Sequence, residues 1–309
     1  MKRIIQILLL IIVVGVGALA ITFMPATLPV EDLPKVNVPV AHAPAEMRIY
    51  AIEAGKMLSQ AGFAYRGGSL TEPRVFGMGG ILVKHPQGYL LFDTGFGSDV
   101  DTHFKTIPKL MQATSKYEKE PTVAAQLRTA GMEPLGLKGV VLTHAHWDHV
   151  SGLADMPGVS VWVNAQEKDF IQNGGDMSAL IRGFGDLNYH VYDFPSGPYL
   201  GFNNSYDVFG DGSVVLVPAF GHTPGSIIAF INLPGDKRYA LVGDLVWQTE
   251  GIEIPAEKPW MLRRMVDWDA QRVRDLIVHM HQLKAAMPNL VIVPAHDRRV
   301  WDALPKLGS

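Results

Sequence analysis

Residues 142–152 read LTHAHWDHVSG, and this stretch decides how the rest of the chain is interpreted. Three histidines and one aspartate stand within six positions, directly after an apolar run that predicts a buried strand. His144 and His146 are two residues apart, so in an extended segment both side chains face the same way and can share one ion. Asp148 and His149 follow a turn and face elsewhere, which favours a second ion beside the first. The stretch therefore predicts four ligands of a site for two metal ions.

The remaining ligands are expected at the ends of other apolar runs. One run, VVLVPAFGH, ends at His222; YALVGD ends at Asp244, and LVIVPAH ends at His296. Neighbouring strands of a sheet bring their matching ends together, whatever the sequence separation. Each ion needs at least three protein ligands, so these residues complete two sets of three. Asp244 can bridge the two ions through its two carboxylate oxygens.

The composition limits the chemistry further. The chain has 309 residues, of which 48% are hydrophobic and 18% charged, with a formal net charge of −3 and no cysteine. This length suits one large catalytic domain or two small ones. Without cysteine, disulfides, thiolate zinc sites and a cysteine nucleophile are excluded, so histidine and carboxylate must hold the metal, which favours Zn²⁺. No basic excess exists to attract nucleic acid, and none is predicted as a partner.

The N-terminal segment is expected to lie outside the folded domain. Lys2 and Arg3 precede an apolar stretch from Ile4 to Met24. A cleaved signal peptide would use Ala18-Leu19-Ala20 as its small-residue cleavage site, whereas an uncleaved anchor would use the whole stretch to cross a bilayer. In both cases the domain lies outside the cytoplasm. It is either free in the periplasm or anchored to a membrane, which the protein contacts only through this N-terminal segment. The predicted divisions are a signal peptide or membrane anchor at 1–24, a proline-rich spacer at 25–46 and the catalytic domain at 47–309.

Within the domain, short apolar runs alternate with helical patterns. Residues 79–84 and 89–92 predict a hairpin, 122–130 predict a helix closed by Gly131, and 269–287 predict a longer helix capped by Asp267 or Asp269. The histidines outside the ligand set are expected to be structural: His42, His85, His103, His190, His279 and His281.

The motifs together resemble a known superfamily. THAHWDH at 143–149, GHTPGS at 221–226, GD at 243–244 and PAHD at 294–297 are similar, in order, to the motifs of the metallo-β-lactamase superfamily, and DTG at 93–95 resembles its turn behind the ligands. The resemblance covers roughly residues 47–300 and implies an αβ/βα sandwich, with two mixed sheets face to face and helices outside. It also implies the ligand sets: His144, His146 and His222 for one metal, Asp148, His149 and His296 for the other, and Asp244 as the bridge.

Two subfamilies fit the sequence. Residues 207–226 and the segment from Trp268 onward resemble the N-acyl homoserine lactonase-like group, which opens the lactone ring of quorum-sensing signals. Organophosphate triesterases of the methyl parathion hydrolase type share the metal motif and remain the alternative. Lactonases commonly carry a tyrosine three residues after the bridging aspartate, where this chain has Trp247, and Ser226 stands where many relatives repeat histidine.

The expected activity is hydrolysis of a small-molecule ester or lactone. Two divalent cations would lower the pKa of a bridging water, and the resulting hydroxide would attack the ester, lactone or phosphoester centre. Asp148 or Asp244 would pass a proton to the leaving alkoxide. Trp147 and Trp247, with Trp260 and Met261, would form an apolar wall for the substrate or simply pack in the core. The alternative of another class is a non-catalytic metal-binding protein of the cell envelope.

Overall fold

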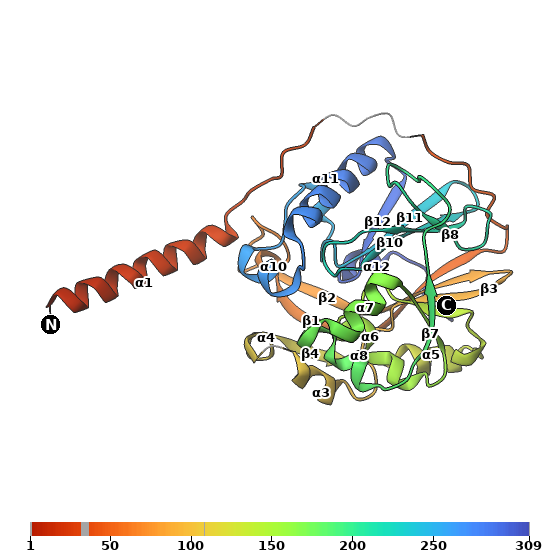
Figure 1. The fold of residues 1–309 in the computed structure, drawn as a ribbon, viewed down its shortest axis with the longest axis horizontal. Coiled ribbons are helices and arrows are strands. Elements are labelled where there is room, and N and C mark those ends of the chain that lie inside the picture. The colour runs from red at the N-terminus through yellow and green to blue at the C-terminus, as the bar shows by residue number, and fades with distance from the viewer. Residues whose placement is uncertain (1, 32–36, 108, 309) are drawn as a thin grey trace.

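A computed structural model describes residues 2–31, 37–107 and 109–308, and its domain is built on two sheets packed face to face (Figure 1). The larger sheet has the strand order β4-β1-β2-β3-β5-β6-β7, and the smaller has the order β12-β11-β10-β9-β8. The strands of the larger sheet are β1 Arg48–Gln60, β2 Pro73–His85, β3 Gly88–Phe92, β4 Lys116–Lys119, β5 Gly139–Val141, β6 Ser160–Asn164 and β7 Asn188–Tyr192. Those of the smaller sheet are β8 Tyr206–Asp207, β9 Val214–Pro218, β10 Ile227–Leu233, β11 Lys237–Gly243 and β12 Leu290–Pro294.

The apolar runs become strands because each is buried in the sandwich. The predicted hairpin is confirmed as β2 and β3, which pair antiparallel with Ile81 opposite Phe92. From β3 onward the larger sheet is parallel through β5, β6 and β7. The inner parallel strands β5 and β6 are covered on both faces, which explains their continuous rather than alternating apolar pattern, whereas β7 at the edge is mostly exposed.

Three groups of buried apolar side chains define the layers. Between the sheets, Ile81 and Phe92 of the larger sheet belong to the same buried cluster as Leu216 and Leu241 of the smaller one. The outer face of the larger sheet is covered by helices that include α5 (Val123–Thr129). The outer face of the smaller sheet is covered by α11 (Ala270–Ala286), through the buried residues Val273, Ile277, Met280 and Leu283. The predicted αβ/βα sandwich is confirmed.

Both predicted helices form, and capping residues mark where they begin. Thr122 caps α5 by accepting from the backbone N–H of Ala125, and Gly131 follows in the left-handed region at φ 74°. Asp269 caps α11, so of the two predicted candidates Asp267 is not the cap. His279 and His281 donate to backbone carbonyls at 2.9 and 2.8 Å, in keeping with the structural role expected for them.

The other helical segments connect the strands or cover the sheets. In chain order they are α2 Ala61–Ala64, α3 Val100–His103, η1 Phe104–Thr106, α4 Lys109–Thr114, η2 Pro134–Gly136, α6 Trp147–Val150, η3 Ser151–Asp155, α7 Ala165–Asn173, η4 Gly175–Ser178, α8 Ala179–Gly183, α9 Glu250–Glu253, α10 Trp260–Val266 and α12 Arg298–Asp302.

The N-terminal segment forms a helix, α1 (Lys2–Phe23), that projects away from the sandwich (Figure 1). Its residues Arg3–Phe23 have a mean hydropathy of 3.0, so by length and composition this is a helix that could cross a membrane. Between α1 and β1, the described residues 24–31 and 37–47 contain no strand and no further helix (Figure 1). Part of the predicted spacer, residues 32–36 with Pro34, lies outside the described residues.

Candidate metal centre

The seven predicted ligands converge at one edge of the sandwich, each from the end of a strand or the turn after it. This follows from the topology, because β5, β9, β11 and β12 all end at this edge. His144 and His146 lie in the loop after β5, Asp148 and His149 in α6, His222 in the loop after β9, Asp244 directly after β11 and His296 two residues after β12.

The side chains fall into the two sets that the resemblance implies. Donor atoms of His144, His146 and His222 lie within 4.8 Å of one another, and those of Asp148, His149 and His296 do the same. A third such group, His144 with His149 and Asp244, overlaps both sets. The seven residues are thus one contiguous cluster with room for two ions.

Asp244 stands between the two sets and turns one oxygen toward each. Its Oδ1 lies 2.9 Å from Nε2 of His296 and 3.3 Å from Nε2 of His149. Its Oδ2 lies 3.6 Å from Nε2 of His222, which belongs to the other set. A carboxylate in this position can bridge two cations.

The chemistry of the donor atoms fits a metal. The Nε2 atoms of His144, His149 and His222 are buried without a hydrogen-bond partner. A buried polar atom left in this way costs about 1–3 kcal/mol, which coordination to a cation would offset. Imidazole nitrogens with carboxylate oxygens are a donor set that suits Zn²⁺. The residues present therefore fit two divalent ions.

Electrostatics favour the neutral form of His144 and His146, two ligands of the first set. Burial, with repulsion from neighbouring imidazoles, holds the pKa of His144 and His146 well below the usual value. Neutral imidazole is the form that binds a cation. Burial also disfavours the charged form of His149, but the carboxylates of Asp93 and Asp244 outweigh it and raise the pKa of His149.

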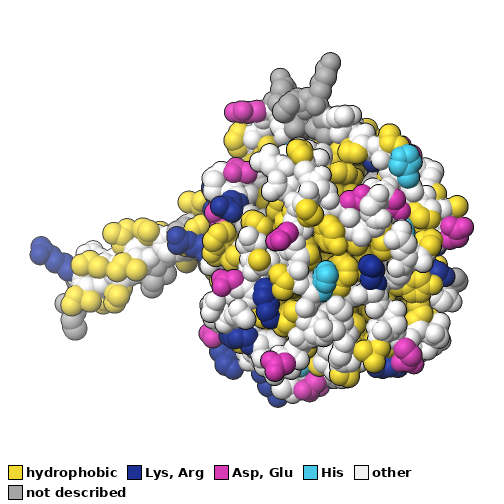
Figure 2. Space-filling model, turned by 45° about the vertical axis from the view of Figure 1, so that its right-hand side comes forward, with side chains coloured by type: hydrophobic (Ala, Val, Ile, Leu, Met, Phe, Trp, Pro, Cys, Tyr) yellow, Lys and Arg dark blue, Asp and Glu magenta, His cyan; other side chains and the backbone are white. Residues whose placement is uncertain are grey.

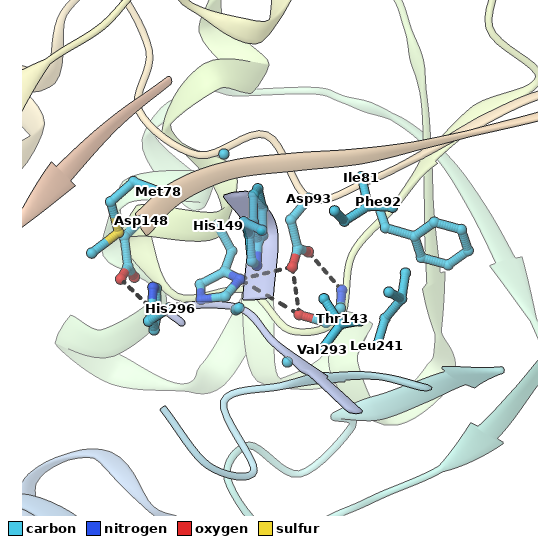
Figure 3. Close-up of a pocket in the computed structure, with 14 residues that line it drawn as sticks. Met78, Ile81, Phe92, Asp93, Thr143, Asp148, His149, Leu241, Val293 and His296 are labelled. Carbon is cyan, nitrogen blue, oxygen red and sulfur yellow. Dashed lines mark hydrogen bonds and ion pairs between the residues drawn. The ribbon is translucent and has the colours of Figure 1, made fainter. Parts of the chain in front are cut away.

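The Nδ1 atom of several histidine ligands has a hydrogen-bond partner on the side away from the metal centre, and this contact fixes the orientation of the ring. Asp93 contacts Nδ1 of His149 at 2.8 Å and also accepts from the backbone N–H and the hydroxyl of Thr143, both at 2.7 Å (Figure 3). Asp93 adopts the left-handed φ of 56° in the DTG turn to do so. His296 donates from Nδ1 to the carbonyl of Gly77 at 2.9 Å. Such bonds set the tautomer, leaving Nε2 for the ion.

Three residues in this supporting layer were missed by sequence reasoning. Asp267 contacts Nδ1 of His222 at 2.7 Å and accepts from Nζ of the buried Lys258 at 2.9 Å. Glu167, buried on α7, accepts from Ala145 and Gly225 of the two ligand loops. Burial raises the pKa of Glu167 to about 7, although these donors favour its charged form. Only Asp267 had a weak signal in the sequence, because it stands beside the helix start that it was one candidate to cap.

A cavity of about 1230 Å³, including its open mouth, leads to the metal centre. Trp147 and Trp247 line it, and the indole of Trp247 donates to Oδ2 of Asp244 at 2.8 Å. Trp260 and Met261 do not line it, so that part of the predicted wall is wrong: they lie in the first turn of α10, which is turned toward α1. The remaining lining is mostly apolar and includes Met57, Phe76, Met78, Ile107, Met111, Met177, Leu180 and Val266.

Comparison with known proteins places this centre in a family. The model of the metallo-beta-lactamase superfamily matches residues 80–296. The chain is 29% identical over 233 residues to the probable metallo-hydrolase Rv2300c of Mycobacterium tuberculosis, covering 70% of this chain and 73% of that protein. It is 26% identical over 231 residues to the N-acyl homoserine lactonase AttM of Agrobacterium fabrum, covering 72% of this chain and 82% of that protein.

The fold is also similar to solved structures. A variant of AiiA from B. thuringiensis, with N-decanoyl-L-homoserine bound at its active site, matches with a TM-score of 0.67 at 17% identity, covering 85% of this chain and 98% of that one. Because the family match spans most of the domain and ends on the last histidine of the cluster, the chain belongs to the metallo-β-lactamase superfamily, as a metal-dependent hydrolase.

Proposed function

We propose that the chain is a dinuclear zinc hydrolase that opens the ring of lactones bearing an acyl chain, of the N-acyl homoserine lactone class. The observation that carries this proposal is the position of Asp244, whose two oxygens face the two ligand sets separately. The likeness to AttM, an N-acyl homoserine lactonase, supports the choice of substrate class.

The ligand residues have distinct tasks in this proposal. His144, His146 and His222 hold one cation, Asp148, His149 and His296 hold the other, and Asp244 joins them. Two such cations, when bound, supply a water that is nucleophilic near neutral pH and polarise the oxygen of the substrate. Asp93 and Asp267 keep the rings of His149 and His222 in the ligating tautomer.

The carboxylates at the centre would handle the proton. Asp148 is partly exposed and lines the cavity, with its Oδ2 only 3.4 Å from Nε2 of His296. From the cavity wall beside the cluster it could take a proton from the nucleophilic water and return it to the leaving oxygen of the ring. Asp244 is buried, and the indole of Trp247 occupies its Oδ2, so Asp148 is the better placed of the two to protonate the alkoxide.

The shape of the cavity favours a substrate with an apolar arm. Methionine and aliphatic side chains dominate its lining. Trp147 also lines it, and behind the cavity wall this ring packs against Phe96 and Phe104. Such a lining favours an acyl chain held by burial of apolar surface over a polar substrate.

The test is a substrate panel on the metal-loaded protein: a homoserine lactone with a long acyl chain, one with a short chain, a phosphotriester and a simple aryl ester. We expect the long-chain lactone to have the highest kcat/KM, and Asp148→Asn to lower it by about 100-fold or more while zinc is still bound at saturating concentration. Asp176→Asn, a change at another carboxylate of the cavity, is the control and should retain turnover. Preference for the phosphotriester would replace the lactonase assignment by that of a triesterase.

A further inference from the structure

The end of α1 is held by the folded domain. Arg66 donates from Nε to the carbonyl of Met24 and from Nη2 to the carbonyl of Ile21, both at 3.3 Å. The backbone N–H of Gly67 donates to the carbonyl of Phe23 at 3.0 Å. The last carbonyls of a helix lack partners inside it, so the turn at 65–68 acts as the cap of α1.

Side chains reinforce this attachment. The rings of Phe23 and Phe63 meet edge to face at 5.5 Å between centroids. Thr22, only 3% exposed, accepts from the backbone N–H of Met261 at 3.3 Å. The helix end is thus packed between α2 and α10, and α1 leaves the domain from a fixed place.

The rest of α1 has no protein partner to bury it within the described residues. The apolar window of α1 is 0% buried, and its exposed side chains are almost all aliphatic (Figure 2). With a rise of 1.5 Å per residue, the 21 residues of its predominantly apolar span Arg3–Phe23 extend over about 30 Å, the thickness of the hydrocarbon core of a bilayer. A bilayer is the environment that would cover this surface.

The surface around the attachment has the character of a membrane interface. Trp260 is 50% exposed and Leu70 51% exposed beside the end of α1, and the guanidinium of Arg264 lies 5.2 Å from the Trp260 ring. Tryptophan and arginine are the side chains that gather at the level of lipid headgroups.

Positive charge lies at this surface. Arg264 of α10 is exposed beside Trp260. Behind it, Glu257 pairs with Arg66, Arg263 and Arg274, whose side chains are 20, 12 and 34% exposed, so in the described part of the chain three guanidinium groups share this carboxylate. Exposed guanidinium groups are attracted to anionic lipid headgroups.

We propose that α1 is retained as a membrane anchor and that the docking face, defined as residues 61–70 with α10, rests on a bilayer containing anionic phospholipid. The residues of α1 that the domain holds, 21–24, follow Ala20, so cleavage there would remove only the exposed apolar part of the helix. With α1 uncleaved, the same attachment fixes how the domain lies on the bilayer. The geometry has a consequence for the catalytic cavity. Because α10, which is about 10 Å long, runs from Trp260 on the docking face to Val266 in the cavity wall, one short helix joins the docking face to the cavity.

The first test asks whether α1 stays attached. The full chain is expressed in a bacterium, membrane and soluble fractions are separated after a carbonate wash, and the intact mass in each is measured. We expect the full-length mass in the membrane fraction only. A soluble species that lacks residues 1–20 would overturn the proposal.

The second test asks whether the docking face meets lipid. The full chain is reconstituted in phosphatidylcholine vesicles with phosphatidylglycerol, and amide hydrogen exchange is compared with the same chain in detergent micelles. We expect exchange at 61–70 and 260–266 to slow by about tenfold in vesicles, and the double variant Trp260→Ser, Arg264→Gln to lose this protection while α1 still anchors it. Leu135→Ser, at a 69% exposed apolar residue in η2, is the control and should leave the protection unchanged.

Two outcomes would contradict the lipid contact. Equal exchange in vesicles and micelles would show that the bilayer does not touch this face. Protection in micelles that rises with protein concentration would show that a second copy of the chain covers it instead. Neither readout depends on turnover, so the substrate can be misassigned without affecting this result.

Discussion

Asp267 and His222 are joined by a contact of 2.7 Å between Oδ1 and Nδ1, and the buried Lys258 holds the same carboxylate at 2.9 Å. The lysine keeps Asp267 charged, the carboxylate accepts a hydrogen bond from Nδ1–H of His222, and Nε2 of His222 is left to face the metal centre. Asp267, 45 positions after His222, thus fixes which nitrogen of His222 faces the metal centre.

Asp267→Asn should weaken metal binding without unfolding the domain. The amide can donate to Nδ1 and thereby favour the wrong tautomer, so we expect affinity for Zn²⁺ to fall by about 10–100-fold. The matched control is Asp269→Asn, two residues away, which only modifies the cap of α11. Isothermal titration of zinc into both apoproteins measures the difference. Equal affinities would show that Asp267 does not orient His222.

Glu167→Gln should loosen the two ligand loops against each other. Glu167 accepts from the backbone N–H of Ala145 and, through its other oxygen, from the hydroxyl of Thr223 and the N–H of Gly225. A glutamine amide group must face one of these donors, so we expect the free energy of unfolding to fall by about 1–3 kcal/mol. Urea unfolding of the apoprotein measures it, with the exposed Asp169→Asn on the same helix as control. An unchanged midpoint would mean that the loops hold each other without Glu167.

The stability of the domain should depend on His103 in mildly acidic solution. His103 is buried, and the hydroxyl of Ser151, which accepts from the N–H of Gly97, lies 2.8 Å from its Nδ1. Burial lowers the pKa of His103 in the folded state. The unfolded chain therefore binds the proton first, as pH falls through about 6.5, and stability is lost down to the folded-state pKa.

The comparison that isolates this effect uses His103→Phe. We expect the wild type to lose stability relative to this variant between about pH 7.5 and pH 5, as measured by urea unfolding at each pH. His42→Asn, at an exposed histidine, controls for the loss of any one imidazole. Parallel pH curves for wild type and His103→Phe would contradict the prediction.

Removal of the metal should destabilise the folded domain. The cluster contains unpartnered Nε2 atoms and crowded carboxylates that only the native fold brings together. A ligand that binds only the native state at 100 times its Kd stabilises it by about 2.7 kcal/mol. We therefore expect a chelator to lower the Tm by several degrees and added Zn²⁺ to restore it. A Tm that changes with neither chelator nor added Zn²⁺ would indicate that the centre binds no ion.

The fold and the cluster were predictable because each ligand follows an apolar run. His222, Asp244 and His296 each end such a run, and strands buried side by side bring their ends together. Asp267 and Glu167 were not predictable in the same way, because their partners are brought to them by loops whose paths depend on the whole domain. Trp260 was misplaced for a similar reason: the start of α10 contacts Thr22, a residue more than 200 positions earlier, and no local pattern indicates that contact.

The central claim is that two ions, joined by Asp244, are needed for one reaction. The most direct measurement is a titration of the apoprotein with Zn²⁺ in which bound metal and hydrolysis of a long-chain acyl homoserine lactone are followed together. We expect turnover to appear as the second equivalent binds and to reach its plateau at about two ions per chain. Full turnover at one equivalent, or two bound equivalents with no hydrolysis of the lactone, would contradict it.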